Sequence, residues 1–288
     1  MAERVEIFEV GPRDGLQNEA ARIAARDKIA LVDCLSAAGF SRIEVASFVS
    51  PKRVPQMAGS GEVLRGIRRA PGVRYAALTP NLRGLDDALE AGADEVAVFG
   101  SASEGFSKAN INATIDESLA RFAPVLEAAG AAGVRVRGYV SCVVACPYDG
   151  PVAPAQVARV AARLWELGCY EISLGDTIGQ ARPEEVDAML AAVGEVVPPD
   201  RVAGHFHDTS GRALDNVEAA LAHGVRVFDA AVGGLGGCPF APGAAGNVAT
   251  EKVHERLIGL GYETGLDADV LARAAGMAKA MRGGPQES

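Results

Sequence analysis

The sequence has few aromatic residues, no paired cysteines and no long apolar run. Aromatic side chains make up 5% of the 288 residues and tryptophan occurs once, so alanine and the branched aliphatic residues must fill the core. No stretch approaches the roughly 20 consecutive apolar residues of a membrane span, which argues against a membrane partner. The cysteines lack C-x-x-C spacing, which favours a reducing compartment, of which the cytoplasm is the simplest.

Basic residues are also in short supply. Lysine and arginine number 28 against 37 aspartate and glutamate residues, a formal net charge of −9. Because binding to a phosphate backbone requires a surplus of cations, this charge argues against a nucleic-acid partner. The apolar content of 49% excludes an intrinsically disordered chain. Glycine is abundant, with 34 residues, which indicates many turns or close backbone approaches.

Short β-branched runs alternate with stretches of helical periodicity along the chain. Such alternation predicts a parallel sheet. Eight units without a break in composition predict one α/β domain, a (β/α)8 TIM barrel over residues 1–288 with an additional C-terminal helix at 266–282. An open, doubly wound sheet is the alternative. The expected strands are 5–10, 42–47, 73–79, 95–101, 134–142, 171–174, 202–207 and 227–232, and the expected helices are 26–38, 60–69, 82–91, 114–132, 154–167, 183–195, 211–222 and 247–259.

Several polar residues stand at or beyond the carboxyl ends of these strands, which form the catalytic face of a barrel. His205 and His207 are two residues apart on an expected strand, so both side chains project from one face. They supply half of a metal site, or else form a hydrogen-bonded histidine pair. Arg13 and Asp14 follow the first strand and offer an anion clamp and an oxygen ligand, or an ordinary turn with an ion pair. Asp176 follows another strand, where it is either catalytic or the cap of a turn.

A glycine-rich segment, 233–246, follows the last expected strand. Its length and glycine content are typical of a lid that closes over a ligand. Cys238 is the only potentially reactive side chain in it. Asn247 stands where the next helix is expected to begin, and it can serve there as an N-cap.

Charged residues also occupy strand positions that point into the barrel. Arg137 alternates with apolar neighbours, and Glu44 and Glu171 lie beside isoleucine and valine residues. Since buried charges need partners, we expect a cluster of Arg137 with carboxylates, which serves as scaffold, as support for the site, or as both.

Taken together, these stretches resemble the 3-hydroxy-3-methylglutaryl-CoA lyase family. The resemblance extends from about residue 5 to residue 265 and implies a metal-dependent TIM barrel that binds Mg²⁺ or Mn²⁺. It is carried by VGPRDGLQNE (10–19), SFVSPKRVPQM (47–57), LTPNLRG (78–84), RGYVSC (137–142), GCYEISLGDTIG (168–179), HFHDT (205–209) and GLGGCPFAPGAAGN (234–247).

The resemblance assigns roles to individual residues. The family's metal ligands fall on Asp14, His205, His207 and Asn247. Its residues for catalysis and substrate binding fall on Arg13, Glu44, Asn110, Arg137, Asp176 and Cys238. The chain departs from the family at Ser210, where tyrosine is frequent, and at Ala245, where serine is frequent.

The implied reaction is the retro-Claisen cleavage of (S)-3-hydroxy-3-methylglutaryl-CoA to acetyl-CoA and acetoacetate, a step of leucine degradation and ketone-body formation. In that reaction a metal held by the four ligands would lower the pKa of the substrate hydroxyl, and Asp176 or His205 would take its proton. Arg13 stabilises the thioester enolate and Cys238 protonates its carbon.

The sequence also allows other functions. One is a lyase for a different or bulkier 3-hydroxyacyl-CoA, or a condensing synthase of the same barrel group. Another is a non-catalytic barrel that binds metal or acyl-CoA. Lys52, Arg53 and Lys108 either contact the phosphates of CoA or form solvated surface charge. The resemblance also implies a homo-oligomer.

Overall fold

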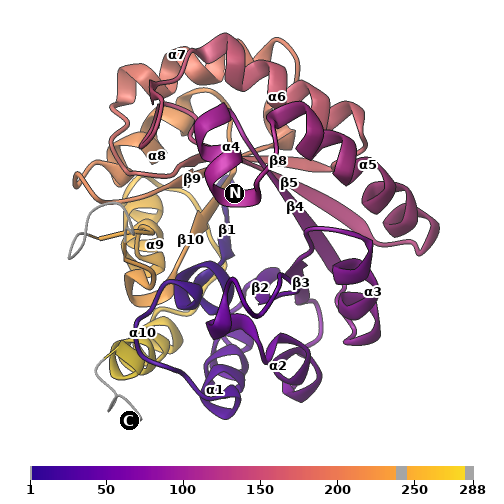
Figure 1. Cartoon of the computed structure of the whole chain (residues 1–288). Coiled ribbons are helices and arrows are strands. Elements are labelled where there is room, and N and C mark those ends of the chain that lie inside the picture. Colours follow the sequence, from indigo (N-terminus) through magenta and orange to yellow (C-terminus); the bar gives the residue numbers. More distant parts are fainter. Residues whose placement is uncertain (1, 238–244, 283–288) are drawn as a thin grey trace.

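Figure 1 shows the fold of the chain in a computed structural model that describes residues 2–237 and 245–282. Eight parallel strands close into a barrel in the order β1-β10-β9-β8-β5-β4-β3-β2, and helices surround it. The first strand pairs with both β10 and β2, which closes the ring. The predicted TIM barrel is therefore confirmed, and the open doubly wound sheet is wrong. The barrel strands are β1 (Glu6–Glu9), β2 (Arg42–Ser47), β3 (Arg74–Leu78), β4 (Glu95–Ser101), β5 (Arg135–Ser141), β8 (Glu171–Asp176), β9 (Val202–Phe206) and β10 (Val227–Ala230).

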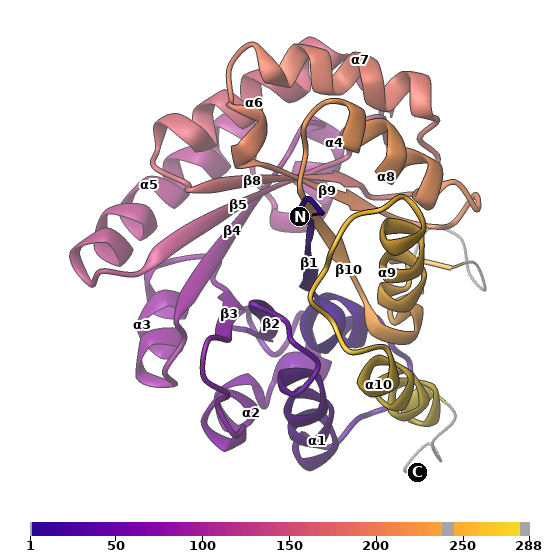
Figure 2. The ribbon, with the colours of Figure 1, turned by 180° about the vertical axis from the view of Figure 1, so that it is seen from behind.

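The helices follow the strands as expected and cover the outside of the barrel. They are α1 (Ala25–Ser36), α2 (Ser60–Gly66), α3 (Leu82–Glu90), α4 (Glu104–Ile111), α5 (Ile115–Ala131), α6 (Pro154–Glu166), α7 (Pro183–Gly194), α8 (Ala213–Ala222), α9 (Thr250–Gly259) and α10 (Ala268–Arg282). The predicted C-terminal helix is present as α10, which packs against α1 beside α9 (Figure 2). Within the described ranges, no helix combines the length and the apolar character needed to cross a bilayer.

Besides four short 3₁₀- or π-helical segments among the described residues, the structure adds a helix and a strand pair that the sequence analysis treated as loops. The first is α4, which Ser103 caps by accepting a hydrogen bond from the amide of Phe106 at 3.2 Å. It is only eight residues long and contains Gly105, a poor helix former, so the sequence gives little sign of a helix here. The second is a two-stranded antiparallel pair, β6 (Ala145–Cys146) and β7 (Gly150–Pro151). Both elements follow strand ends, and Phe106, Asn110 and Ile111 of α4 line the barrel mouth.

The main apolar core lies between the strands and the helices rather than inside the barrel. Ile43, Val96 and Leu164 are fully buried in it, and each such side chain contributes about 1.5–3 kcal/mol by leaving water. The barrel interior instead holds ionisable side chains on neighbouring strands, among them Arg137 and Glu171, which stand opposite each other on β5 and β8. This polar interior supports the site above it.

Glu9 ties together the segments that lead into the glycine-rich region. Its Oε1 accepts hydrogen bonds from the amides of Gly11 at 2.8 Å and Val232 at 3.0 Å, and its Oε2 accepts one from Thr250 Oγ1 at 2.7 Å. Burial raises the pKa of this carboxyl to about 7, although the three hydrogen bonds oppose the shift. The native protein therefore binds this proton more tightly than the unfolded chain does.

A Glu9→Gln variant is expected to reduce the loss of stability with rising pH. For the wild type, the contribution of Glu9 is full below its ordinary pKa of 4.5 and is lost as the pH rises through about 7. The loss is on the order of 3 kcal/mol. Glutamine preserves the two amide contacts and carries no titrating proton. Denaturant unfolding between pH 5 and pH 8 measures the difference, with exposed Glu62→Gln as the control. A Glu9→Gln profile parallel to the wild type would exclude Glu9 as the titrating group.

Candidate active site

A cavity of about 1220 Å³ opens at the carboxyl ends of the barrel strands. Residues that follow β1, end β3 and β5, or lie at the end of β9 line it, which is the catalytic face of this fold. The lining residues used below are Arg13, Asp14, Val49, Arg53, Leu78, Arg83, Phe99, Asn110, Arg121, Tyr139, His205 and His207.

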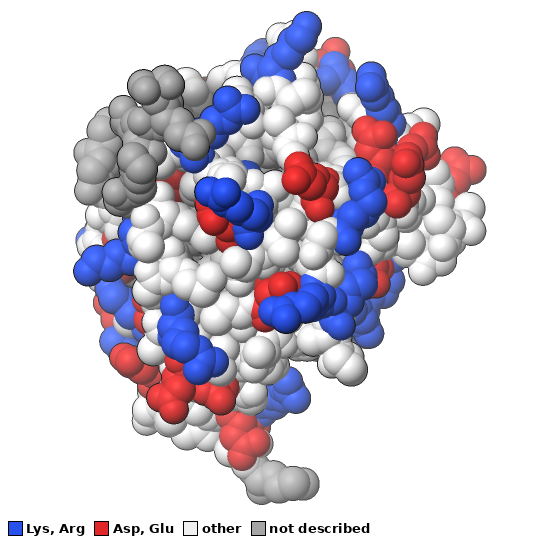
Figure 3. Space-filling model, turned by 90° about the horizontal axis from the view of Figure 1, so that it is seen from below, with Lys and Arg blue, Asp and Glu red and all other residues white. Residues whose placement is uncertain are grey.

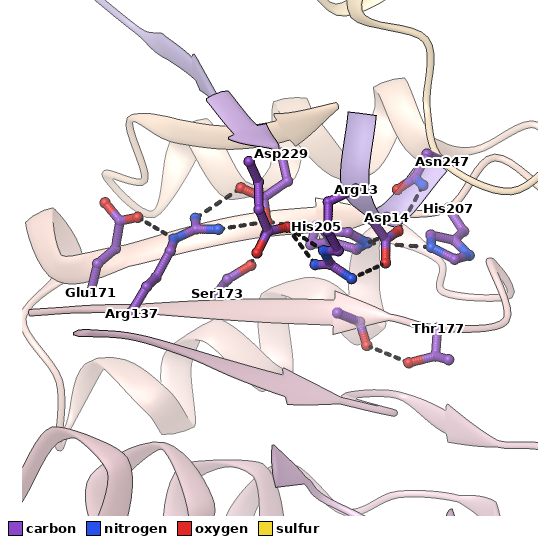
Figure 4. Close-up of polar contacts among 12 residues, drawn as sticks. Arg13, Asp14, Arg137, Glu171, Ser173, Thr177, His205, His207, Asp229 and Asn247 are labelled. Atoms are coloured by element: carbon purple, nitrogen blue, oxygen red, sulfur yellow. Dashed lines mark hydrogen bonds and ion pairs between the residues drawn. The ribbon is translucent and has the colours of Figure 1, made fainter. Parts of the chain in front are cut away.

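Asp14, His205 and His207 form a compact cluster in this cavity (Figure 4). Their potential ligand atoms all lie within 4.8 Å of one another. The two Nε2 atoms of the histidines face each other at 3.3 Å, as the two-residue spacing predicted. Asn247 joins the cluster because its backbone bridges that of His207 and its Nδ2 donates to Asp14 Oδ2 at 2.8 Å.

The donor set fits a hard divalent cation. Two imidazole nitrogens, a carboxylate and an amide are the mixed nitrogen and oxygen ligands that Mg²⁺ and Mn²⁺ accept. Burial, with the neighbouring His205, lowers the pKa of His207 to about 4, so its ring is neutral near pH 7. Burial opposes ionisation of Asp14, but Arg13 and the two histidines outweigh it and lower its pKa to about 2. His207 and Asp14 therefore have the protonation states that cation binding requires. For His205, burial opposes the charged ring, but Asp229 and Asp14 outweigh it and raise the pKa above its ordinary value.

Below the cluster, Asp229 holds His205 in place. Its Oδ2 lies 3.0 Å from His205 Nδ1 and also accepts a hydrogen bond from Ser173 Oγ at 2.8 Å. Arg137 donates to both Asp229 oxygens at 2.8 and 2.9 Å, and to Glu171 at 2.6 Å. The expected cluster of Arg137 with carboxylates is thus confirmed. Burial opposes ionisation of Asp229, but Arg137 and His205 hold its pKa well below its ordinary value. A carboxylate at Nδ1 fixes the ring so that Nε2 faces a metal.

Sequence reasoning missed Asp229. A signal was present, because Asp229 is an acidic residue between Phe228 and Ala230 on a short apolar strand. The same pattern identified Glu44 as inward-facing. Arg137, the partner of Asp229, is 92 residues away in the sequence, so only the closed barrel shows the contact.

Arg13 connects the cluster to Glu44. Its Nε donates to Glu44 Oε2 and its NH1 donates to Asp14 Oδ1, both at 2.6 Å. The guanidinium is buried, yet it also lines the cavity. Since arginine has five N–H groups, those not used by the two carboxylates can reach a substrate oxygen.

Other predicted site residues lie apart from the cluster. The carboxylate of Asp176 accepts the backbone amides of Gln180 and Ala181 at 3.2 and 2.9 Å, so it caps the turn after β8. Burial raises its pKa above the ordinary value. Arg137 lies beneath the cavity and is connected to the cluster through Asp229, which contacts both Arg137 and His205. Asn110 lies at the cavity rim, where its carbonyl accepts from Arg53 NH1 at 3.1 Å. Cys238 lies outside the described residues.

The cations at the cavity mouth differ in part from those expected. Arg53 lines the cavity together with Arg83 and Arg121. Lys52 and Lys108 are exposed and are not among the described lining residues. On the face drawn in Figure 3, acidic and basic side chains lie intermixed.

Known proteins are similar to this chain in sequence and fold. The family model described as HMGL-like matches residues 4–277. A relative from Pseudomonas aeruginosa, named 3-hydroxy-3-isohexenylglutaryl-CoA/hydroxy-methylglutaryl-CoA lyase, is 60% identical over 95% of this chain and 91% of its own length. The HMG-CoA lyase structure from Brucella melitensis is also 60% identical and has a TM-score of 0.97 over 98% of this chain and 100% of that one.

A further solved structure is more distant but contains a ligand. It is an HMG-CoA lyase from Acinetobacter baumannii in complex with coenzyme A and 3-methylmalate, 39% identical. Its TM-score is 0.92, and the match covers 99% of this chain and 93% of that chain. With a family match over nearly the whole length and relatives this similar, the chain belongs to the HMGL-like family, which includes the hydroxymethylglutaryl-CoA lyases that its motifs resemble.

Proposed function

We propose that this chain is a hydroxymethylglutaryl-CoA lyase that cleaves (S)-3-hydroxy-3-methylglutaryl-CoA to acetyl-CoA and acetoacetate. The observation that carries the proposal is the placement of Arg13 beside the Asp14–His205–His207 cluster in one cavity. A carbon–carbon lyase of this type needs a cation where charge develops and a metal site beside it. Its relatives at 60% identity carry lyase names.

The metal is a divalent cation, Mg²⁺ or Mn²⁺, and Asp14, His205, His207 and Asn247 would hold it. When bound, it makes the substrate hydroxyl more acidic. Both ring nitrogens of His205 are engaged, Nδ1 with Asp229 and Nε2 in the cluster. The geometry therefore favours His205 as a ligand over His205 as the base. Asp176, whose carboxylate accepts the amides of the turn after β8, is then the proposed base.

Arg13 would bind the thioester oxygen of the substrate and stabilise the negative charge that develops there. Glu44 would hold the guanidinium in place, since its Oε2 accepts from Arg13 Nε. Cys238 remains the proposed donor of the proton to the acetyl carbon. Asn110 and Arg53 lie at the rim, where the CoA moiety would pass.

A coupled assay for acetoacetate tests the function directly. Release of acetoacetate from 3-hydroxy-3-methylglutaryl-CoA is expected with Mg²⁺ or Mn²⁺, loss of activity with EDTA, and recovery when the metal is returned. Binding of Mn²⁺ without any acetoacetate would overturn the proposed substrate and would favour the non-catalytic binding barrel or the condensing synthase.

A second candidate substrate has a longer alkyl group at C3, as in the name of the Pseudomonas aeruginosa relative. The cavity has an apolar wall made by Val49, Leu78, Phe99 and Tyr139, with the small Ala97 packed among them. Among the described lining residues, neither Ser210 nor Ala245 occurs, so these two departures do not define that wall. The ratio of kcat/KM for the methyl and isohexenyl substrates tests the candidate, and a ratio near one supports it.

The remaining assignments complete the proposal. Arg53, Arg83 and Arg121, which line the cavity, would meet the phosphates of CoA. The described cysteines are all free thiols, which supports a cytoplasmic location. One barrel domain over residues 1–288 would carry the whole activity, and it would act as a homo-oligomer, which light scattering of the purified protein checks.

A further inference from the structure

Tyr139 is a buried tyrosine in the wall of the cavity. It lies on β5, is 8% exposed and lines the cavity. Among the described residues, no donor or acceptor reaches its hydroxyl oxygen, Oη. Buried polar groups nearly always have a partner, because an unsatisfied one lowers stability. An orphan hydroxyl in the wall of a substrate cavity is best explained by a partner that the substrate brings.

The surroundings of Tyr139 indicate what that partner is. The guanidinium carbons of Arg137 and Arg13 lie 5.0 and 5.5 Å from its ring centroid, and the ring of His205 meets it edge-on at 6.3 Å. Arg13 also lines the cavity, and a substrate oxygen beside it would gain negative charge as the reaction proceeds. Burial and the nearby Glu44 raise the pKa of Tyr139 well above its ordinary value, so the hydroxyl keeps its proton and acts as a donor.

A purely structural role through Glu44 does not fit these contacts. Glu44 Oε1 is also buried without a partner in the described part of the chain, yet no hydrogen bond joins it to the Tyr139 hydroxyl. Glu44 contacts Arg13 through its other oxygen, Oε2. Tyr139 therefore does not position Arg13 by way of Glu44, and its side chain lines the cavity although the hydroxyl oxygen itself is buried.

We propose that the Tyr139 hydroxyl donates a hydrogen bond to the thioester oxygen of the substrate as that oxygen becomes an enolate, beside Arg13. This inference rests on the proposed lyase function. In that reaction the C3 hydroxyl gives its proton to the base, and the C2–C3 bond breaks. The electron pair of that bond passes to the thioester as an enolate, and C2 then takes up a proton to give acetyl-CoA. Tyr139 keeps its own proton throughout and is a catalytic residue by hydrogen bonding alone.

A Tyr139→Phe variant tests the proposal because it removes only the hydroxyl and leaves the ring contacts. We expect kcat to fall by about 100-fold, the lower end of the effect of losing one oxyanion donor. KM and Mn²⁺ affinity should stay unchanged, since the interaction forms chiefly in the transition state. The thermal midpoint should be unchanged or higher, because no hydrogen bond within the protein is lost.

Tyr75→Phe is the matched control, since its hydroxyl lies away from the cavity and has two partners. It donates to Ser36 Oγ at 2.9 Å and accepts from the amide of Ala70 at 2.8 Å. This variant should lose thermal stability and keep the wild-type kcat. Tyr139→Phe should thus lower kcat without lowering thermal stability, whereas Tyr75→Phe should lower thermal stability without lowering kcat.

A second readout isolates the enolate. Exchange of the methyl protons of acetyl-CoA with D₂O requires the same enolate without carbon–carbon cleavage, so Tyr139→Phe should slow it by a similar factor. A wild-type kcat in Tyr139→Phe, or a slow kcat with wild-type exchange, would overturn the role of Tyr139. Failure of the wild-type protein to cleave the substrate would instead overturn the proposed function, and the two failures are therefore distinguishable.

Discussion

Replacement of Arg13 by glutamine is expected to reduce turnover by about 1,000-fold or more while Mn²⁺ still binds. The guanidinium lines the cavity and contacts Asp14 Oδ1 at 2.6 Å, so it stands beside the metal cluster. Loss of one neutral oxyanion donor lowers kcat by roughly 10²–10³, and a charged donor contributes more. Steady-state kinetics and a Mn²⁺ titration of the same preparation measure the two effects separately.

The buried ion pair with Glu44 calls for a control on folding. Removing Arg13 alone leaves Glu44 as a buried carboxylate without its cation, which destabilises a protein by about 3–5 kcal/mol. The double variant Arg13→Gln/Glu44→Gln removes both charges, so it should recover most of that stability and remain inactive. Wild-type turnover in the double variant would show that Arg13 serves the fold and not the reaction.

The barrel could be predicted because parallel strands buried on both faces leave a strong local signal. Strands β2 and β4 occupy the predicted residues, 42–47 and 95–101. By contrast, α4 could not be predicted, since its eight residues depend on the Ser103 cap and on packing against β4 and α5. The short pair β6 and β7 has two residues in each strand, too few for any periodic pattern.

The active site, too, could be predicted only in part, because local spacing is visible in the sequence and contacts across the barrel are not. The spacing of His205 and His207 within one strand predicts their common face, and the structure confirms it. The carboxylate that supports His205 comes from β10, and the arginine that holds this carboxylate comes from β5. Such contacts across the barrel leave no spacing in the sequence. The same holds for Tyr139, whose lack of a partner within residues 2–237 and 245–282 becomes visible only when its neighbours are in place.

Replacement of His207 by alanine is expected to weaken Mn²⁺ binding by more than about 100-fold. The expectation follows from comparison with a supporting residue, whose loss typically lowers metal affinity by roughly 10–100-fold. Asp229→Asn is that comparison here, because Asp229 contacts His205 Nδ1 and not the facing Nε2 atoms. Removing His207 deletes a donor outright, so its effect should exceed that of Asp229→Asn.

His223→Ala supplies the control for loss of a histidine as such. His223 lies outside the cavity and contacts Asp187 at 3.2 Å, so its removal should leave Mn²⁺ affinity unchanged. Calorimetric titration of the three variants should therefore rank their affinities in the order His223→Ala, Asp229→Asn, His207→Ala, from tightest to weakest. A His207→Ala variant that binds Mn²⁺ as tightly as His223→Ala would remove His207 from the ligand set. The opposing imidazole nitrogens would then be a hydrogen-bonded pair, the alternative that their spacing alone left open.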